Sequence, residues 1–330
     1  MSKRSQLLES ISETIADYRK GENVSPTPQH VERWVRQFDK SVEVPLLAEM
    51  DHVLNRSYIS KRTAKRFIAN LVTNDTLAGD SPCRFWRQIK FLDIQSSGNS
   101  QRDMLALFDG VLERKCGMEV AKCGANAKAF LYLDDGLFSG NRVRNDLCDW
   151  IRDDAPAKAQ LHVVVMALHI SGWWYAKKAV EATANTEEKE IKITWWRCVE
   201  MEDRKNQIDK SDVLRTTHLP KDKLTGEYVS YLNDCGYPPL LRQADKMGNS
   251  KVFSSEEGRD VLEQQFLQSG LRIREMCPNL KLNHRPLGYS VLKTLGFGSL
   301  IVTYRNCPNT CPLAFWAGDP WYPLFPRKTN

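Results

Sequence analysis

The sequence lacks the features that mark membrane and secreted proteins. No run of 18 consecutive apolar residues is available to cross a bilayer, and no secretory signal can be recognised. The nine cysteines are an odd number, and they are scattered along the chain rather than gathered into a disulfide framework. We therefore expect a cytoplasmic protein with reduced thiols and no membrane partner.

Strong charge and a zinc motif are also absent. Lys and Arg total 47 against 41 Asp and Glu, and a net charge of +6 on 330 residues does not by itself demand a nucleic-acid partner. Cys307 and Cys311 stand close together in NCPNTC, but a structural zinc site needs four ligands at suitable spacing. What the composition does provide, with 42% hydrophobic residues, is enough apolar side chain for a globular core.

The first eighty residues predict a compact helical module. Apolar residues recur at helical spacing within residues 8–18, 31–38, 46–54 and 60–71. The outer face of the fourth helix carries a basic stripe, Lys61, Arg62, Lys65 and Arg66. This stripe would suit the phosphates of a nucleic acid or a partner protein, but it equally fits an ordinary solvated helix face. TNDTLAGDSP at 73–82 predicts a linker that ends the module.

From residue 91 the pattern changes to alternating strands and helices. Apolar runs predict strands, and each of the first three is followed by a loop and then a segment with helical spacing. The runs are FLDIQ at 91–95, AFLYL at 129–133, LHVVVMALHI at 161–170 and EIKITWW at 190–196. This order predicts an α/β protein with a doubly wound, mainly parallel sheet, whose ligands bind at the carboxyl ends of the strands.

The most unusual polar residues follow the second run, in YLDDGLFSGNRV at 132–143. Asp134 and Asp135 are adjacent, and their repulsion is relieved if hydroxyls, a cation or a helix N-terminus lies nearby. Ser139 offers a hydroxyl and Gly140 allows close backbone approach, which suits a phosphate at the start of the next helix. Asp and Gly also serve many strand ends for turn geometry alone, so a plain turn is the alternative.

This stretch resembles the phosphoribosyl-diphosphate motif of the type I phosphoribosyltransferases, in which a hydrophobic strand runs into two acidic residues and a Thr-Gly phosphate loop. The resemblance implies that Asp134 and Asp135 address the ribose hydroxyls of phosphoribosyl diphosphate or a nucleotide, directly or through Mg²⁺. It also implies that five residues surround the 5-phosphate: Phe138, Ser139, Gly140, Asn141 and Arg142. Ser139 replaces the usual threonine conservatively, whereas Asn141 and Arg142 depart from the expected Gly or Lys followed by Thr.

The loop after the first strand, QSSGNSQ at 95–101, stands at an equivalent strand end. Ser97 and Gly98, with Asn99 and Ser100, are candidates for the diphosphate side of the site. An ordinary tight turn with Ser100 as the helix cap is the alternative. Two aromatic residues after the third strand, Trp173 and Trp174, would suit stacking on a base, but we favour a place in the core for them.

Two further segments carry a family resemblance. Residues 31–72 resemble the winged-helix module found in front of certain phosphoribosyltransferase-like proteins. Residues 285–316 resemble the end of the phosphoribosyltransferase-like proteins of bacterial conflict systems, some of which are encoded beside retron reverse transcriptases. We therefore expect a winged-helix-like module at 1–80 and a phosphoribosyltransferase-like domain at 81–330, with a C-terminal extension from about residue 213.

The resemblance implies an effector of anti-phage defence that a partner holds in check and infection releases. A retron reverse transcriptase with its RNA or DNA is the candidate partner. Such an effector would bind a 5-phosphoribosyl group and make or break a bond at its anomeric carbon. Two alternatives stay open: a non-catalytic regulator that senses a nucleotide and uses its helical module to bind nucleic acid or a protein, and a scaffold with a vestigial pocket.

Overall fold

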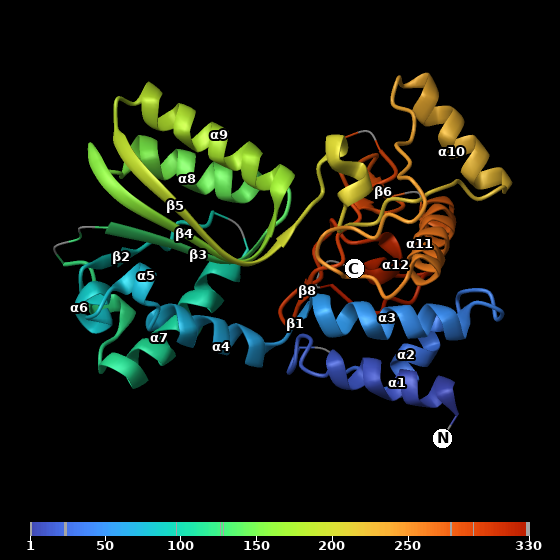
Figure 1. Ribbon diagram of the computed structural model, residues 1–330, viewed down its shortest axis with the longest axis horizontal. Coiled ribbons are helices and arrows are strands. Elements are labelled where there is room, and N and C mark those ends of the chain that lie inside the picture. The colour runs from blue at the N-terminus through green and yellow to red at the C-terminus, as the bar shows by residue number, and fades with distance from the viewer. Residues whose placement is uncertain are drawn as a thin grey trace. The chain divides into compact units, whose positions relative to one another are not determined.

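The computed structural model describes residues 2–22, 25–96, 98–125, 127, 129–277, 279–292 and 294–327. The chain divides into two compact units (Figure 1). The sheet unit is Lys61–Glu200, and the terminal unit joins Met1–Ser60 to Met201–Asn330. Each unit has its own buried residues, so each is described by itself.

The sheet unit is built on four parallel strands in the order β2-β3-β4-β5. Their bounds are β2 Ile89–Phe91, β3 Ala129–Leu137, β4 Lys158–His169 and β5 Glu190–Met201. Ile89 of β2 pairs with Ala129 of β3, and Asp134 of β3 pairs with Val165 of β4. The predicted α/β class and parallel sheet are therefore confirmed.

Helices cover both faces of this sheet, which is why the central strands are nearly continuous apolar runs. Helix α7 (Ser100–Cys116) lies on one face, and α8 (Asn141–Asp153) and α9 (Ile170–Thr186) lie together on the other (Figure 1). Phe130 and Tyr132 of β3 belong to a buried apolar cluster to which α8 also contributes side chains. On the α7 side, Phe108 meets Phe91 of β2 with ring centroids 4.9 Å apart.

Short helices precede β2 and pack beside α7. They are α4 (Lys61–Val72), α5 (Asp75–Ala78) and α6 (Pro82–Arg87), and a 3₁₀ turn η1 (Val120–Lys122) follows α7. The predicted linker at 73–82 is thus partly helical, because Leu77 and Ala78 are buried and the Trp86 indole N–H donates to Val72 O at 2.8 Å. No helix among the described residues is long and apolar enough to span a membrane.

One disulfide departs from the expectation that all thiols are reduced. Cys83 in α6 and Cys116 at the end of α7 have Cα atoms 5.3 Å apart, which is a normal separation for a disulfide, and their sulfurs are bonded. The other seven cysteines are free. The two bonded residues are 33 positions apart, so their proximity comes from the packing of α6 beside α7 rather than from local sequence.

The terminal unit joins the two ends of the chain. Its elements are α1 (Lys3–Thr14), α2 (Pro28–Val35), α3 (Glu43–Ser57), β1 (Tyr58–Ile59), η2 (Lys205–Lys210), α10 (Lys223–Asp234), α11 (Glu256–Met276), β6 (His284–Arg285), β7 (Gly288–Tyr289), β8 (Val302–Thr303) and α12 (Leu313–Trp316). Strand β1 pairs in parallel with β8. The Trp34 indole N–H donates to Ala314 O at 2.8 Å, and the Tyr18 hydroxyl donates to Pro326 O at 3.0 Å. The N-terminal helices and the aromatic tail therefore share one core.

This arrangement differs from the expected division at residue 80. Helices α1 to α3 belong to the terminal unit, whereas α4 belongs to the sheet unit. Among the described residues before 81, β1 is the only strand, and it pairs with β8 instead of forming a hairpin wing. The expected winged-helix module is therefore not shown in these residues, because α3 packs on α11 and α2 on the aromatic tail, whereas α4 packs beside α7.

Candidate functional site

The candidate site lies where the loops after β2 and β3 part to opposite faces of the sheet. These strands are neighbours, but β2 leads to α7 on one face and β3 leads to α8 on the other (Figure 1). Ligands of open α/β sheets bind at such a switch point, outside the carboxyl ends of the strands. The two predicted loops, at 95–101 and 138–142, are the ones that flank it.

The acid pair lies inside β3 rather than beyond its end. Asp134 is 2% exposed and Asp135 is 9% exposed. The Asp135 amide donates to Asp134 Oδ1 at 2.8 Å, and the Ser100 hydroxyl also hydrogen-bonds to the Asp134 carboxylate. The first residue of α7 is thereby tied to the acid pair of β3.

Burial raises the pKa of Asp134 to about 7, and the negative charge of Asp135 contributes in the same direction. The hydrogen bonds from Ser100 and from the Asp135 amide, and the nearby Arg142 guanidinium, oppose this rise. The Asp134 carboxyl is therefore protonated more easily than an exposed aspartate. A ligand that supplies hydroxyl donors or a cation would favour the ionised form.

The phosphate-loop candidate is held by two glycines in close contact. Gly140 has φ of 77° and caps the N-terminus of α8. A Cβ atom on Gly140 would lie 2.2 Å from Gly172 O, and a Cβ atom on Gly172 would lie 1.9 Å from Phe138 O. The loop thus rests directly on the first turn of α9, and neither position has room for a side chain. Such a loop at a helix N-terminus presents backbone to a ligand.

The remaining residues of this loop differ in exposure. Ser139 and Asn141 are half-buried, whereas Arg142 is exposed. The Phe138 ring lies 5.2 Å from the His169 ring, and His169 Nδ1 is 3.3 Å from Leu137 O. These contacts fix the end of β3 against the end of β4.

The loop after β2 is braced by Gln101, which the sequence did not single out. Gln101 is fully buried, and its Oε1 accepts hydrogen bonds from the amides of Ile94 at 2.7 Å and Gln95 at 3.0 Å. Asn99 occupies the N-cap position of α7 and makes no side-chain cap hydrogen bond, so Ser100 is not the cap. Ser100 is the first helical residue, and its hydroxyl is directed to the acid pair. Ser97 lies outside the described residues.

Arg142 brings the two loops together. Gly98 has φ of 89°, and a Cβ atom on it would lie 2.4 Å from Arg142 Nη1. Gly98 and Arg142, which were both expected at the site, are therefore in contact, Gly98 from the loop after β2 and Arg142 from the first turn of α8. The guanidinium also acts electrostatically on Asp134 and on Asp146.

A second buried carboxyl, that of Asp146, hydrogen-bonds to residues next to the site. The Tyr132 hydroxyl donates to Asp146 Oδ2 at 2.8 Å, and the Ser96 amide also hydrogen-bonds to Asp146. Burial raises the pKa of Asp146, while these hydrogen bonds lower it. Tyr132 and Asp146 each sit in a regular apolar pattern in the sequence, so nothing local marked them as partners.

Two other predicted groups are the basic stripe of α4 and the tryptophan pair of α9. The basic stripe of α4 is exposed as expected, with Ala64 and Ile68 buried on the inner face of that helix. Trp173 is half-buried and packs against the core, as favoured, but Trp174 is 48% exposed. Lys177 lies 5.4 Å from the ring centroid of each tryptophan.

Comparison with known proteins identifies the family. The family model described as PRTase-CE matches residues 31–327, which is most of the chain and includes both loops of the site. No curated protein and no solved structure matches the sequence. The parallel sheet and the two loops at the switch point are consistent with this match. The chain belongs to the phosphoribosyltransferase-like PRTase-CE family.

Proposed function

We propose that this protein binds a 5-phosphoribosyl group at the carboxyl ends of β2 and β3 and acts at its anomeric carbon. The observation that carries the proposal is the close contact between the loop at 138–140 and α9, which the two glycines allow. The acid pair lies beside this loop, and Ser100 and Arg142 connect it to the loop after β2. Family membership supports the same ligand class.

In this proposal the loop from Phe138 to Arg142 surrounds the 5-phosphate. The partial positive charge at the N-terminus of α8 and the Arg142 guanidinium favour an anion there. Asp134 and Asp135 accept the ribose hydroxyls. Gly98, on the facing loop, lets the Arg142 guanidinium lie against the backbone on the diphosphate side.

Mg²⁺ fits these residues as an indirectly held ion. The described residues contain no group of three or more His, Cys, Asp or Glu side chains that would form a complete metal site. Mg²⁺ is often held by one or two carboxylates together with substrate phosphates, and Asp134 and Asp135 supply that number. When bound, the ion would stabilise negative charge on a departing diphosphate.

The chain's own residues would position the sugar rather than attack it. Bond-making or bond-breaking at the anomeric carbon passes through an oxocarbenium-like state, which is stabilised by correct orientation and by preorganised charges. Asp134 and Asp135 would orient the ribose, and the loop at 138–142 would fix the phosphate. The acceptor is a nucleobase, a nucleotide or an RNA, and the reaction is transfer or its reverse.

We further propose that the protein is an effector of a bacterial anti-phage defence system. The resemblance of residues 285–316 to proteins of such systems supports this context. The partner would be another component of the defence complex, such as a retron reverse transcriptase with its RNA or DNA. The exposed basic residues of α4 provide one surface for nucleic acid.

One observation favours a second candidate, a regulator that binds the phosphoribosyl group without turnover. Arg142 replaces the threonine of the type I motif, and its guanidinium lies against Gly98 on the facing loop. A bulky cation between the two loops would hold a phosphate well but restrict the space for an acceptor. Ligand binding without any product would select this candidate.

The experiment that tests the proposal is product analysis. Purified protein is incubated with phosphoribosyl diphosphate, Mg²⁺ and a pool of nucleobases, nucleotides and RNA, and the mixture is analysed by mass spectrometry. We expect a phosphoribosylated product or free diphosphate, absent when Asp134 and Asp135 are both replaced by alanine. Cellular toxicity is measured in parallel, and toxicity that survives the double replacement would contradict a role for the site in the effector.

Replacing Ser139 by aspartate is expected to weaken phosphoribosyl diphosphate binding at least about tenfold, because a carboxylate would stand where the 5-phosphate is bound. Ser139→Thr is the matched control, since it retains the hydroxyl and restores the residue usual in type I enzymes. Isothermal titration calorimetry measures both. Equal affinity of the aspartate and threonine variants would show that the phosphate is bound elsewhere.

A further inference from the structure

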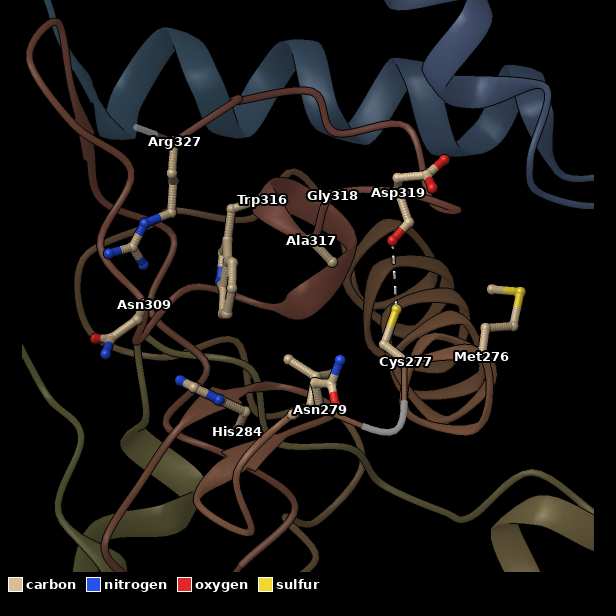
Figure 2. Close-up of a pocket in the computed structure, with 11 residues that line it drawn as sticks. Met276, Cys277, Asn279, His284, Asn309, Trp316, Ala317, Gly318, Asp319 and Arg327 are labelled. Atoms are coloured by element: carbon tan, nitrogen blue, oxygen red, sulfur yellow. Dashed lines mark hydrogen bonds between the residues drawn. The ribbon is translucent and has the colours of Figure 1, made fainter. Parts of the chain in front are cut away.

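A cavity of about 540 Å³ lies in the terminal unit, and none of its residues belongs to the proposed phosphoribosyl site (Figure 2). Pockets for small ligands commonly range from about 300 to 1,000 Å³. The lining comes from the end of α11, from β6, from α12 and from the segment after it. Because these segments are far apart in sequence, the cavity is a product of the tertiary fold.

Trp316 forms a fixed aromatic wall of this cavity. Its indole N–H donates to Cys311 O at 2.9 Å, which locks the ring orientation. The His284 ring meets it edge-on, with ring centroids 5.6 Å apart, and Tyr289 supports His284 from another direction at 5.5 Å. A rigid pair of aromatic rings suits a planar heterocycle, which loses little entropy on stacking.

One side of the cavity is cationic. The Arg327 guanidinium lies 5.0 Å from the Trp316 ring centroid. Burial lowers the pKa of the His284 imidazole, and the charges of Arg327, Lys281 and Arg274 act in the same direction. In Figure 2 the carboxylate of Asp319 points away from Trp316, while its carbonyl oxygen faces the Cys277 thiol at 3.9 Å. Among the described residues that line the cavity Asp319 is the one acid, and it lies on the side of Trp316 opposite to Arg327.

The polar side chains and the sulfur-containing side chains lie on different sides of the Trp316 ring. Arg327, Asn309 and His284 lie on one side of Trp316 in Figure 2, and Cys277 and Met276 lie on the other. Among the described residues, His284 Nδ1 is buried without a hydrogen-bond partner. The amide of Asn309 offers both a donor and an acceptor. An elongated ligand with an anionic end and an apolar, planar end matches this distribution.

We propose that the cavity binds a mononucleotide, with its phosphate at Arg327 and Asn309 and its base against Trp316 and His284. The proposal does not rest on the phosphoribosyl site, which lies in the sheet unit. It adds a second ligand to the protein, bound by the unit that the two chain ends build. A ligand bound here would stabilise the terminal unit by mass action.

The first test is calorimetric titration of the full chain with the four nucleoside monophosphates and, separately, with inorganic phosphate. At least one nucleotide is expected to bind in the cavity, as the single site that remains in Asp134→Asn, with an affinity reduced at least about tenfold by Arg327→Gln and by Asn309→Asp. Lys281→Gln is the matched control, since Lys281 is an exposed cation near His284 that does not line the cavity. Asp134→Asn is expected to leave this binding unchanged.

Three outcomes would overturn the proposal: no nucleotide binds, phosphate alone binds as tightly as the nucleotides, or binding is lost in Asp134→Asn while it survives in Arg327→Gln.

A second measurement needs no variant. Cys277 lines the cavity, and Cys198 is an exposed thiol on β5. A saturating nucleotide is expected to slow maleimide labelling of Cys277, read by peptide mass spectrometry, and to leave Cys198 unchanged. Equal labelling of Cys277 with and without bound nucleotide would contradict the site.

Discussion

Replacing Gly172 by alanine is expected to remove phosphoribosyl diphosphate binding and to destabilise the sheet unit. The new Cβ atom would lie 1.9 Å from Phe138 O and 2.9 Å from Gly140 N, and both atoms are backbone, so the loop or the first turn of α9 must move. A displacement of about 1 Å lowers a function that depends on geometry about 100-fold. Overpacking lowers the free energy of unfolding by about 1–3 kcal/mol. Titration calorimetry and urea unfolding measure the two effects.

Gly110→Ala is the matched control in the same unit. Gly110 lies within α7, and a Cβ atom there would meet only Arg114 Nη1 at 3.8 Å, an ordinary contact. Alanine is the better helix former, so the free energy of unfolding should rise by up to about 1 kcal/mol, with ligand affinity unchanged. If Gly172→Ala binds ligand as well as Gly110→Ala does, the close contact between the loop and α9 is not needed for the site.

Asp134→Asn is expected to stabilise the protein at alkaline pH while it abolishes ligand binding. Burial raises the pKa of the Asp134 carboxyl to about 7, so keeping it ionised in the folded protein is unfavourable. Each unit of difference between the folded-state and unfolded-state pKa changes the free energy of unfolding by about 1.4 kcal/mol. At pH 9 the raised pKa of Asp134 therefore lowers the stability of the wild type by several kcal/mol. Asparagine keeps the shape, and its Oδ1 can still accept from the Asp135 amide and from Ser100.

The sign of this effect fixes its pH window. Because the pKa is higher in the folded state, the folded protein binds more protons between about pH 4 and pH 7, and wild-type stability falls as the pH rises through that range. The variant should therefore match the wild type near pH 4 and exceed it most above pH 7. Urea unfolding without Mg²⁺ at several pH values measures the difference. Asp149→Asn, which alters an acid with a 65% exposed side chain on α8, is the control and should show little change. A stability difference that is constant with pH would contradict the raised pKa.

The parts of the site that the sequence predicted are those whose evidence is local. The apolar run of β4 and the acids of β3 are contiguous, and their order fixes which strand ends carry polar groups. Gly140 was identified because a glycine in the loop between a strand and a helix allows close backbone approach to a ligand. The parallel sheet followed from the alternation of strands and helices.

The parts that were missed depend on contacts between distant segments. Gly172 follows a strand in an unremarkable position, and its importance arises only because Phe138 O approaches it from another loop. The pairing of β1 with β8 joins residues more than 200 positions apart, and no local sequence pattern predicts it. The same holds for Cys83 and Cys116. Helical periodicity alone described the first eighty residues correctly as helices but gave no information on what covers their apolar faces.

The most direct test of the central claim is calorimetric titration of phosphoribosyl diphosphate with Mg²⁺ into the wild type and into the variant in which Asp134 and Asp135 are both alanine. The account predicts one saturable site in the wild type and loss of binding in the variant, whose folding is verified by circular dichroism. Undiminished binding by the double variant, or none by the wild type, would contradict it.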